Sequence, residues 1–463
     1  MPRPLRFAAA GVVLYFLYFH GLTSVGLIGP DEPRYASVAR DMAVTGDWIT
    51  PRLWGDAWFE KPALEYWGQA LAFKLGLGDD LSPRLFNALC AAALVWFFYR
   101  TLAREFSPQI ALSSTTILAT SIAWIAEARI AVMDMPLAAS FSAAMLFALR
   151  GNLAMCGVLL GVAMLAKGLV GLVLAIPVAW WLRHEWRKFP VALMGVAIVA
   201  LPWYAAVTLR HGAVFLNEFF VKHHFSRFAE GALQHVQPWW FFVPVLLAGL
   251  FPWTPLVALL RRPADRREAF LWMWLVWGLL FLSASRNKLP GYALPLLPPL
   301  AALLGIAISR AAQPKVWAAA CGALLCLTPV AAAVLPEALA GGLSRATFAW
   351  PLLAMLAVGA AGVVAGLWKR ELAVGGVTVL CVTLLGMRVF PLLDERASAR
   401  GMWLQIARQR DQVCIEQLHR SWRYGLNYYL GRPVPECIYE PRPVRLFQRD
   451  TEQPLLMFGP KLD

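Results

Sequence analysis

Charged side chains are scarce in this sequence. Asp, Glu, Lys and Arg make up 15% of the 463 residues, whereas hydrophobic residues make up 59%. Soluble domains carry roughly 25% charged residues, because a surface that faces water has to be covered with polar groups. A soluble fold of this length is therefore excluded, and the composition indicates a chain that lies mostly in a lipid bilayer.

Negative charge is scarcer than positive charge, with 28 acidic residues against 42 Lys and Arg and a net charge of +14. Such an excess can mark a nucleic-acid partner, a membrane surface or an anionic substrate. The basic residues occupy alternate short gaps between apolar runs, as at Arg100 and Arg104, Arg150, and Arg310 with Lys315. This alternation is what the positive-inside rule predicts for cytoplasmic loops. The charge thus reflects membrane topology, and nucleic-acid binding is disfavoured.

Metal-binding cysteine spacing is also lacking. Five of the seven cysteines lie inside apolar runs, where a free cysteine is an ordinary core residue: Cys90, Cys156, Cys321, Cys326 and Cys381. Cys414 and Cys437 lie in the polar C-terminal segment and could pair if that segment faces an oxidising compartment. The sequence leaves this pairing open.

Long apolar runs fill most of the chain. A membrane-spanning helix needs ~20 mostly apolar residues, and thirteen candidate spans lie near 7–27, 85–100, 108–126, 135–149, 153–166, 168–182, 190–209, 239–260, 270–285, 291–309, 316–335, 347–367 and 372–390. Because the runs recur so far along the chain, the first is expected to be a retained span and not a cleaved signal peptide. We expect an all-α polytopic membrane protein with its N-terminus in the cytoplasm and its C-terminus outside.

Two of the predicted outer loops are long, at residues 28–84 and 210–238. In the first, PRYASVARDMAV and PALEYWGQALAFKLG have helical periodicity, so we expect amphipathic helices along the membrane surface. After Leu393 the chain becomes polar, with a helical stretch and the strand-like ECIYE and VRLFQ. The sequence predicts a transmembrane catalytic domain over residues 1–393 and a small α/β domain over residues 394–463.

The first long loop gathers ionisable residues in two motifs. GPDEPRY contains Asp31, Glu32 and Arg34, and WFEKPALEYW contains Glu60 and Lys61. Such groups at a membrane surface can handle a charged headgroup whose tail stays in lipid. Alternatively, the acidic residues cap the helices that begin near the prolines of these motifs. Both interpretations stay open.

Asp134 lies at the outer end of the fourth predicted span, in ARIAVMDMPLAA. A helix cap before Pro136 accounts for a polar residue there equally well. The predicted topology, however, places Asp134 on the same membrane face as Asp31. Two carboxylates that reach one face from separate spans favour a shared site.

The second long loop and the tenth span add further candidates. Glu60 together with His224 could bind a divalent ion, although two neighbouring histidines without fixed ligand spacing are more often solvated. Arg227 follows His224 closely, and Lys288 and Tyr292 lie at the outer end of the tenth span. For Arg286 and Lys288, contact with lipid phosphates is the alternative.

Ionisable residues are rare at the middle depth of the predicted spans, where Lys167 is the main exception. A transporter keeps such groups near the midplane, because its substrate has to cross there. A flippase for lipid-linked sugars is therefore the less favoured alternative. The pattern favours catalysis at the outer membrane face on a substrate with a lipid anchor.

Several of these motifs together resemble a known family. GPDEPRYASVARDM, TGDWITPRLWGDAWFEKPALEYW, ARIAVMDMPLAA, LAKGLVG, HHFSRF followed by PWWFFVPVLLAGLFPW, and RNKLPGYALPLLPPLA occur in that order. Over about residues 1–310 the chain resembles the integral-membrane glycosyltransferases of the C-type fold, specifically the bacterial lipid A aminoarabinose transferases. Protein O-mannosyltransferases are more distant relatives. Thirteen spans with an outer C-terminal domain are also similar to that family.

The resemblance implies an inverting transfer of a sugar from undecaprenyl phosphate to an acceptor at the periplasmic face of the bacterial inner membrane, without a nucleotide cofactor. It implies a catalytic role for Asp31 and Asp134. It further implies substrate contacts from Arg34, Lys61, Arg227, Lys288 and Tyr292, with Lys61 at the carrier phosphate. Glu60 and His224 match positions that hold a divalent metal ion in the family.

The resemblance leaves the acceptor open. The chain is shorter than a typical aminoarabinose transferase, chiefly in its C-terminal domain, and beyond residue 310 the similarity is general. WRYGLNYYLGRPV is similar to a piece of the related outer domain. Lipid A is one candidate acceptor, and another lipid, a polysaccharide or a protein side chain are the others.

Overall fold

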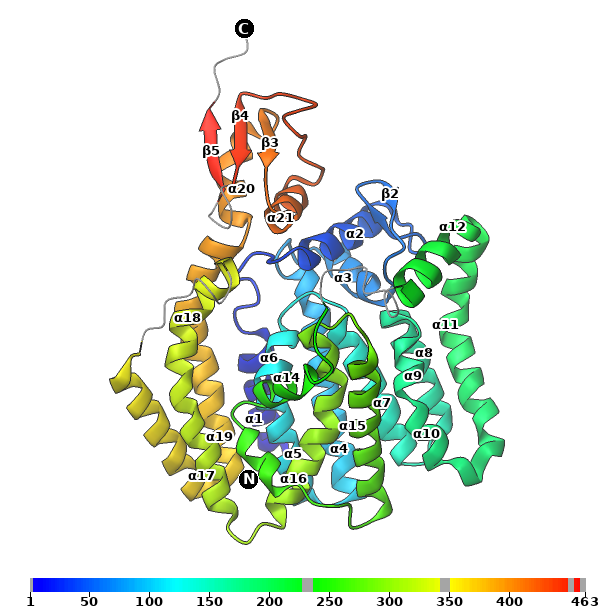
Figure 1. The fold of residues 1–463 in the computed structure, drawn as a ribbon, viewed down its shortest axis with the longest axis vertical. Coiled ribbons are helices and arrows are strands. Elements are labelled where there is room, and N and C mark those ends of the chain that lie inside the picture. The colour runs from blue at the N-terminus through cyan, green and yellow to red at the C-terminus, as the bar shows by residue number, and fades with distance from the viewer. Residues whose placement is uncertain (1–2, 227–235, 342–349, 449–453, 459–463) are drawn as a thin grey trace.

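The computed structural model describes residues 3–226, 236–341, 350–448 and 454–458, and these residues are mostly helical. The helices form one bundle, and the C-terminal segment projects from one end of it (Figure 1). By length and composition, six helical stretches can cross a membrane within the described residues: Ser82–Glu105, Arg183–His211, Arg266–Ala284, Pro290–Ser309, Pro314–Leu339 and Leu352–Ala397. The chain is thus a multi-pass membrane protein.

These stretches are divided into elements by short breaks. They comprise α4 (Ser82–Glu105), η2 (Arg183–Lys188), α11 (Phe189–His211), α15 (Arg266–Ala284), η5 (Pro290–Leu296), α16 (Leu297–Ser309), α17 (Pro314–Leu324), η6 (Leu325–Leu327), α18 (Thr328–Gly341) and α19 (Leu352–Ala397). Within α19 the backbone leaves helical geometry at Lys369 and Arg370. This break separates two helical arms, which correspond to the last two predicted spans.

Shorter apolar helices account for much of the remaining predicted spans. They are α1 (Arg3–Leu14) with η1 (Tyr15–Phe19), α7 (Asp134–Leu149), α8 (Leu153–Lys167), α9 (Val170–Leu174) and α10 (Ile176–Trp181). The pair α5 (Pro108–Thr120) and α6 (Ile122–Ala128) is bent by 60° between its two members. The predicted span 239–260 contains two short helices, α14 (Phe242–Gly249) and η4 (Thr254–Leu259). The short helices α12 (Ala213–Leu216) and η3 (Asn217–Ser226) follow α11.

Small residues allow the helices to approach closely. At the crossing of α17 and α19, a Cβ on Gly322 would lie 2.1 Å from the carbonyl oxygen of Gly362, and the reverse holds for a Cβ on Gly362. In lipid the hydrophobic effect gives helices little reason to associate, so backbone contact of this kind contributes van der Waals packing instead. These two glycines let the first arm of α19 lie directly on α17.

The long loop between η1 and α4 folds into a small unit, called the first loop below (residues 28–81). It contains α2 (Asp31–Thr45), β1 (Arg52–Leu53), β2 (Asp56–Ala57) and α3 (Leu64–Lys74), and β1 pairs antiparallel with β2. Buried Tyr35, Met42, Leu53 and Tyr66 form part of its apolar core. The two helices predicted here are thus present, and both lie at the end of the bundle that carries the C-terminal segment (Figure 1).

The C-terminal segment contains α20 (Arg400–Ile406), η8 (Ala407–Gln409), β3 (Val413–Gln417), α21 (Arg420–Leu430), β4 (Val444–Phe447) and β5 (Leu455–Phe458). The sheet order is β3-β4-β5, with β3 and β4 parallel and β4 and β5 antiparallel. The prediction of a strand at VRLFQ is confirmed by β4. The prediction of a strand at ECIYE is wrong, because this stretch forms a turn in which the amides of Tyr439 and Glu440 donate to the carbonyl of Glu436.

Candidate active site

Four side chains of the first loop form a row of alternating charge. Arg34 Nη2 lies 2.5 Å from Asp31 Oδ1 and 3.4 Å from Glu60 Oε2, and Lys61 Nζ lies 3.4 Å from Glu60 Oε1. The Glu60 side chain is 8% exposed, whereas that of Asp31 is 44% exposed. Asp31 is thus the carboxylate of this row that an incoming molecule can reach.

The helix-cap interpretation of the acidic residues is wrong. The residues that cap α2, α3 and α7 are Pro30, Ala63 and Met133, and none of them makes a side-chain cap hydrogen bond. Asp31 and Asp134 are instead the first residues of α2 and α7. Their carboxylates bind cationic side chains, and their position in the first turn is also favourable for the helix dipole.

Aromatic rings surround the guanidinium of Arg34. Its Cζ lies 5.3 Å from the ring centroid of Tyr35 and 5.5 Å from that of Trp58, within the range of cation–π attraction. Burial by itself would lower the pKa of Arg34, but Tyr35, Glu60 and Asp31 together raise it above its ordinary value. Arg34 therefore stays charged and keeps the two carboxylates beside it.

A second cluster joins three helical segments. Lys167 Nζ, at the end of α8, lies 2.5 Å from Asp134 Oδ1 at the start of α7, and 4.0 Å from the ring centroid of Tyr292 in η5. The structure thus brings together Asp134 and Tyr292, which the sequence predicted as site residues. It adds Lys167, which in the sequence stands out as an ionisable residue in an apolar run and as part of the LAKGLVG motif, but not as a site residue.

Gly291 lies directly against the second cluster, where the lack of a side chain leaves room for the carboxyl groups. A Cβ at Gly291 would lie 2.8 Å from Glu127 Oε1 and 3.3 Å from Asp134 Cγ. Glu127 of α6 therefore faces the same region as Asp134. No motif in the sequence distinguishes it from the other acidic residues. Any side chain at this position would press on both carboxyl groups.

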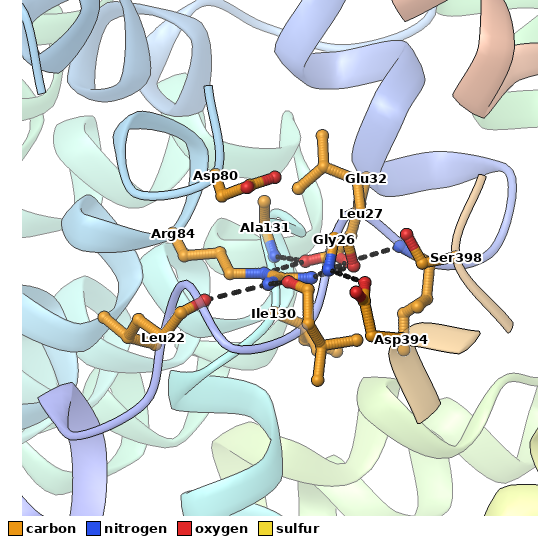
Figure 2. A network of polar contacts seen from close by, with 12 residues as sticks. Leu22, Gly26, Leu27, Glu32, Asp80, Arg84, Ile130, Ala131, Asp394 and Ser398 are labelled. Carbon is orange, nitrogen blue, oxygen red and sulfur yellow. Dashed lines mark hydrogen bonds and ion pairs between the residues drawn. The ribbon is translucent and has the colours of Figure 1, made fainter. Parts of the chain in front are cut away.

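Buried Glu32 and Arg84 connect the first loop to the bundle (Figure 2). Arg84 Nε and Nη2 donate to Glu32 Oε1 and Oε2 at 2.9 and 2.7 Å, and the amide of Ala131 donates to Glu32 Oε1 at 2.7 Å. Glu32 follows Asp31 in the sequence, and Ala131 lies three residues before Asp134. One ion pair thus holds the segments that carry both catalytic candidates.

The segment before Asp134 is held from a second direction. The side-chain amide of Asn87 donates to the carbonyls of Ile130 and Val132 at 2.6 and 2.8 Å. Asn87 lies one turn after Arg84 on α4, so the same helix positions this backbone twice. The start of α7 is therefore fixed relative to α2.

Lys288 lies in a different environment from the other predicted site residues. It is buried, and its Nζ donates to the carbonyls of Ser285 and, at 3.1 Å, Gln237. Desolvation lowers its pKa from the ordinary lysine value. These contacts fasten the segment before η5, and they do not bring Lys288 to either charged cluster.

The second long loop leaves two predicted residues outside the described part. The side chain of His224 and the whole of Arg227 lie outside the described residues. Within residues 3–226, 236–341, 350–448 and 454–458, no group of three or more His, Cys, Asp or Glu is placed to hold a metal ion. In that part of the chain, Glu60 is engaged by the two cations Arg34 and Lys61.

Known proteins share both sequence and fold with this chain. A family model described as dolichyl-phosphate-mannose-protein mannosyltransferase matches residues 5–229. The undecaprenyl phosphate-α-4-amino-4-deoxy-L-arabinose arabinosyl transferase 1 of Pseudomonas fluorescens is 34% identical over 328 residues, which are 65% of this chain and 57% of that protein. The resemblance to the aminoarabinose transferases is thereby confirmed. The match nevertheless spans little more than half the length of this relative.

Solved structures extend the likeness to nearly the whole chain. The crystal structure of ArnT from Cupriavidus metallidurans bound to undecaprenyl phosphate superposes with a TM-score of 0.73 at 23% identity, covering 98% of each chain. The apo structure of ArnT from the same organism gives 0.71 at 25% identity, covering 96% of this chain and 87% of that one. The described chain has the fold of that protein, including its C-terminal segment.

Proposed function

We propose that this protein is an inverting glycosyltransferase that moves a sugar from a polyprenyl-phosphate carrier to an acceptor at the membrane surface. The observation that carries the proposal is the pair of carboxylate–cation clusters, Asp31 with Arg34 and Asp134 with Lys167, at one end of a membrane helix bundle. The names of the relatives support it, because one is an undecaprenyl phosphate-aminoarabinose arabinosyl transferase and another was crystallised with undecaprenyl phosphate.

The chemistry requires stabilisation of a leaving phosphate. When the bond between the anomeric carbon and the phosphate oxygen breaks, both electrons stay on the phosphate, and fixed cations in a poorly hydrated site stabilise this charge. We assign this role to Lys61 and Arg227, with Arg34, Lys288 and Tyr292 as further substrate contacts. Lys61 suits the role because its side chain is only 13% exposed.

Asp31 is the proposed base when the acceptor is a hydroxyl group. The acceptor oxygen attacks the anomeric carbon from the face opposite the phosphate, and its proton passes to the carboxylate of Asp31. When the acceptor is a phosphate oxygen, which carries no proton, Asp31 instead orients the groups around it. Asp134 is the second proposed catalytic carboxylate. A divalent ion at Glu60 and His224 is a further part of the proposal. It would share the Glu60 carboxylate with Arg34 and Lys61, and it would supply positive charge.

The proposal includes an arrangement in the membrane. Residues 1–393 would form the catalytic domain with thirteen spans in the bacterial inner membrane, and residues 394–463 a periplasmic α/β domain. The N-terminus would be cytoplasmic, and α2 and α3 would lie along the periplasmic surface. In this arrangement the donor enters from the lipid and the acceptor reaches the same site from the periplasmic side.

The decisive experiment uses purified protein in liposomes with a radiolabelled polyprenyl-phosphate sugar and a mixture of candidate acceptors. We expect wild-type protein to transfer the label, and Asp31→Asn and Lys61→Ala to abolish transfer. Asp56→Asn is the matched control, because Asp56 is an exposed carboxylate of the same loop. Full activity of both site variants would refute the site assignment. Movement of the intact lipid between leaflets without bond cleavage would favour a flippase.

The acceptor can be identified by mass spectrometry of lipid A and envelope glycans from cells with and without the protein. We propose lipid A as the first candidate, because the relatives transfer aminoarabinose by name and the resemblance is to lipid A transferases. A mass difference confined to another lipid, a polysaccharide or a glycoprotein would replace lipid A as acceptor. The same comparison would identify the sugar from its mass.

A further inference from the structure

Helix α21 of the C-terminal segment is fastened to the first loop by two adjacent tyrosines. The Tyr428 hydroxyl donates to the carbonyl of Asp79 at 2.6 Å, and the guanidinium of Arg40 lies 4.0 Å from the Tyr428 ring centroid. The Tyr429 hydroxyl donates to Asp80 Oδ1 at 2.8 Å. Both tyrosines therefore fix the position of α21 relative to α2 and to the segment just before α4.

Tyr424 lies one turn before Tyr428, on the same face of α21. Its ring stacks on Trp54, with centroids 5.6 Å apart and an angle of 28° between the planes. The guanidinium of Arg34 lies 5.8 Å from the centroid of the Tyr424 ring. The C-terminal segment thus supplies the third aromatic ring around Arg34, beside Tyr35 and Trp58.

Arg34 is the link between Tyr424 and the reacting groups. It binds Asp31 at 2.5 Å and Glu60 at 3.4 Å, and its Nε is buried without a hydrogen-bond partner among the described residues. Packing against rings therefore has a large share in fixing the orientation of the guanidinium. A change in one of these rings would let Arg34 turn, and Asp31 would move with it.

A disulfide closes the part of the chain that contains α21. Cys414 of β3 is bonded to Cys437, and the loop between them includes every residue of the helix. This pairing answers the question that the sequence left open. A disulfide restricts the conformations open to the loop that it closes. One turn before Tyr429, Gly425 lies against Ala399, where a Cβ would come within 2.6 Å of the Ala399 Cβ.

We propose that the disulfide-closed segment Cys414–Cys437 completes the active site, and that Tyr424 is a positioning residue that orients Arg34 and, through it, Asp31. This inference rests on the proposed transferase function for its kinetic consequence. Its structural content, the shielding of Arg34 by Tyr424, does not depend on that function. The C-terminal segment is thereby part of the catalytic machinery and not only an appendage.

The kinetic test compares Tyr424→Ala, Tyr424→Phe and the disulfide-free double variant Cys414→Ser/Cys437→Ser in the liposome transfer assay. We expect kcat of the Ala and disulfide-free variants to fall about ten- to a hundredfold, the size expected from a small misplacement of catalytic groups. The KM for the carrier should change less than kcat, since Tyr424 touches Arg34 and not Lys61, the proposed contact of the carrier phosphate. Tyr424→Phe should have the wild-type kcat, because it keeps the aromatic ring that packs on Arg34.

The matched control is Tyr439→Ala. It removes an 83% exposed tyrosine of the C-terminal segment that lies outside Cys414–Cys437. We expect it to behave as wild type. Unchanged kcat in Tyr424→Ala, while wild-type protein transfers sugar, would overturn the inference. Loss of kcat in Tyr424→Phe equal to that in Tyr424→Ala would overturn it as well, because the hydroxyl and not the ring would then be needed.

A chemical test separates this inference from the proposed function. Phenylglyoxal modifies accessible guanidinium groups. Mass spectrometry of the peptide that contains Arg34 measures the rate of this modification. We expect the rate at Arg34 to rise several-fold in Tyr424→Ala and in the disulfide-free variant, and to stay at the wild-type value in Tyr439→Ala. An unchanged rate in folded Tyr424→Ala protein would overturn the inference. If the wild-type protein transfers no sugar, the proposed transferase function is refuted. If Arg34 is nevertheless modified faster only in the variants, the contact between Tyr424 and Arg34 is supported.

Discussion

Arg84 and Glu32 form a buried, two-point ion pair between α4 and α2, and the same arginine also donates to the carbonyls of Leu22 and Gly26 at 2.9 and 3.0 Å (Figure 2). A guanidinium is suited to this position because its fork of donors can serve a carboxylate and several carbonyls at once. The pair therefore determines how the first loop is seated on the bundle.

Replacing Arg84 with Met should destabilise the protein by ~3–5 kcal/mol, because it leaves the carboxylate of Glu32 buried without its partner. The free energy of unfolding in detergent, from a denaturant titration, measures this effect. Arg100→Met is the control, since Arg100 is an exposed arginine of the same helix. Equal stability of the two variants would show that the buried pair is not what seats the first loop.

Asp134 and Lys167 should act as one unit in catalysis. Either Asp134→Asn or Lys167→Met breaks the 2.5 Å contact and leaves its partner uncompensated. We expect each single variant to lose most transfer activity, and the double variant to lose no more than the worse single variant. The kcat values of all four proteins give this coupling. Losses that multiply in the double variant would contradict the prediction.

Gly291→Ala should impair transfer without unfolding the protein. The added methyl group would press on the Glu127 carboxylate, 2.8 Å away, and crowd Asp134. The Glu127 side chain can yield, so we expect a drop in kcat with little change in the unfolding midpoint. Gly376→Ala is the control, because a Cβ there meets nothing within 4 Å. A Gly291→Ala protein with wild-type kcat would remove Glu127 and Asp134 from a common site.

The contribution of Asp47 to the folding stability of the first loop should depend on pH. Burial by itself would raise the pKa of Asp47, but hydrogen bonds from the amides of Thr50 and Ile49 and from Arg210 hold it below its ordinary 3.8. The folded pKa is the lower one, so this contribution to stability is complete above about pH 4 and is lost as the pH falls through the folded value.

The stability difference between wild-type protein and Asp47→Asn should therefore shrink between pH 5 and pH 3, which thermal unfolding at each pH measures. The groups are partly exposed, so the full difference should stay below ~1 kcal/mol. A difference that is the same at both pH values would show that the carboxylate of Asp47 is not selectively stabilised in the folded state.

Local sequence predicted the parts of the site that lie close together in the chain. Asp31 and Arg34 are three residues apart on one helix, and Glu60 and Lys61 are neighbours, so their association follows from short-range geometry. The helices of the first loop likewise follow from periodicity. The fold class follows from apolar composition, because only a bilayer accommodates so many apolar runs.

Contacts between distant elements could not be predicted in this way. Four consecutive residues of α7, Met135, Pro136, Leu137 and Ala138, are all buried, although consecutive residues point in different directions around a helix. A helix that is apolar on every side carries no periodic signal for its rotation. Nothing in the sequence therefore showed that Lys167 would meet Asp134, or that Glu127 would face the same region.

The role proposed for Tyr424 could not be predicted from the sequence for a related reason. Its contact with Arg34 depends on how a C-terminal helix sits on a loop near the N-terminus, and the same helix carries three other aromatic residues, Trp422, Tyr428 and Tyr429. Aromatic residues on a helix are usually core residues, so the sequence offered no reason to select one of them. Only the packing of α21 on the first loop shows that Tyr424, and not another aromatic residue of this helix, contacts Arg34.

The contacts around Gly26 impose an order on biogenesis. Asp394 accepts from the amide of Gly26 at 2.7 Å, and the Tyr429 hydroxyl accepts from the amide of Leu27 at 3.1 Å. The ribosome makes the first loop early and these partners hundreds of residues later. The acidic residues of the first loop are therefore synthesised long before these partners. The proposed active site is complete only when the last part of the chain has folded back onto the first.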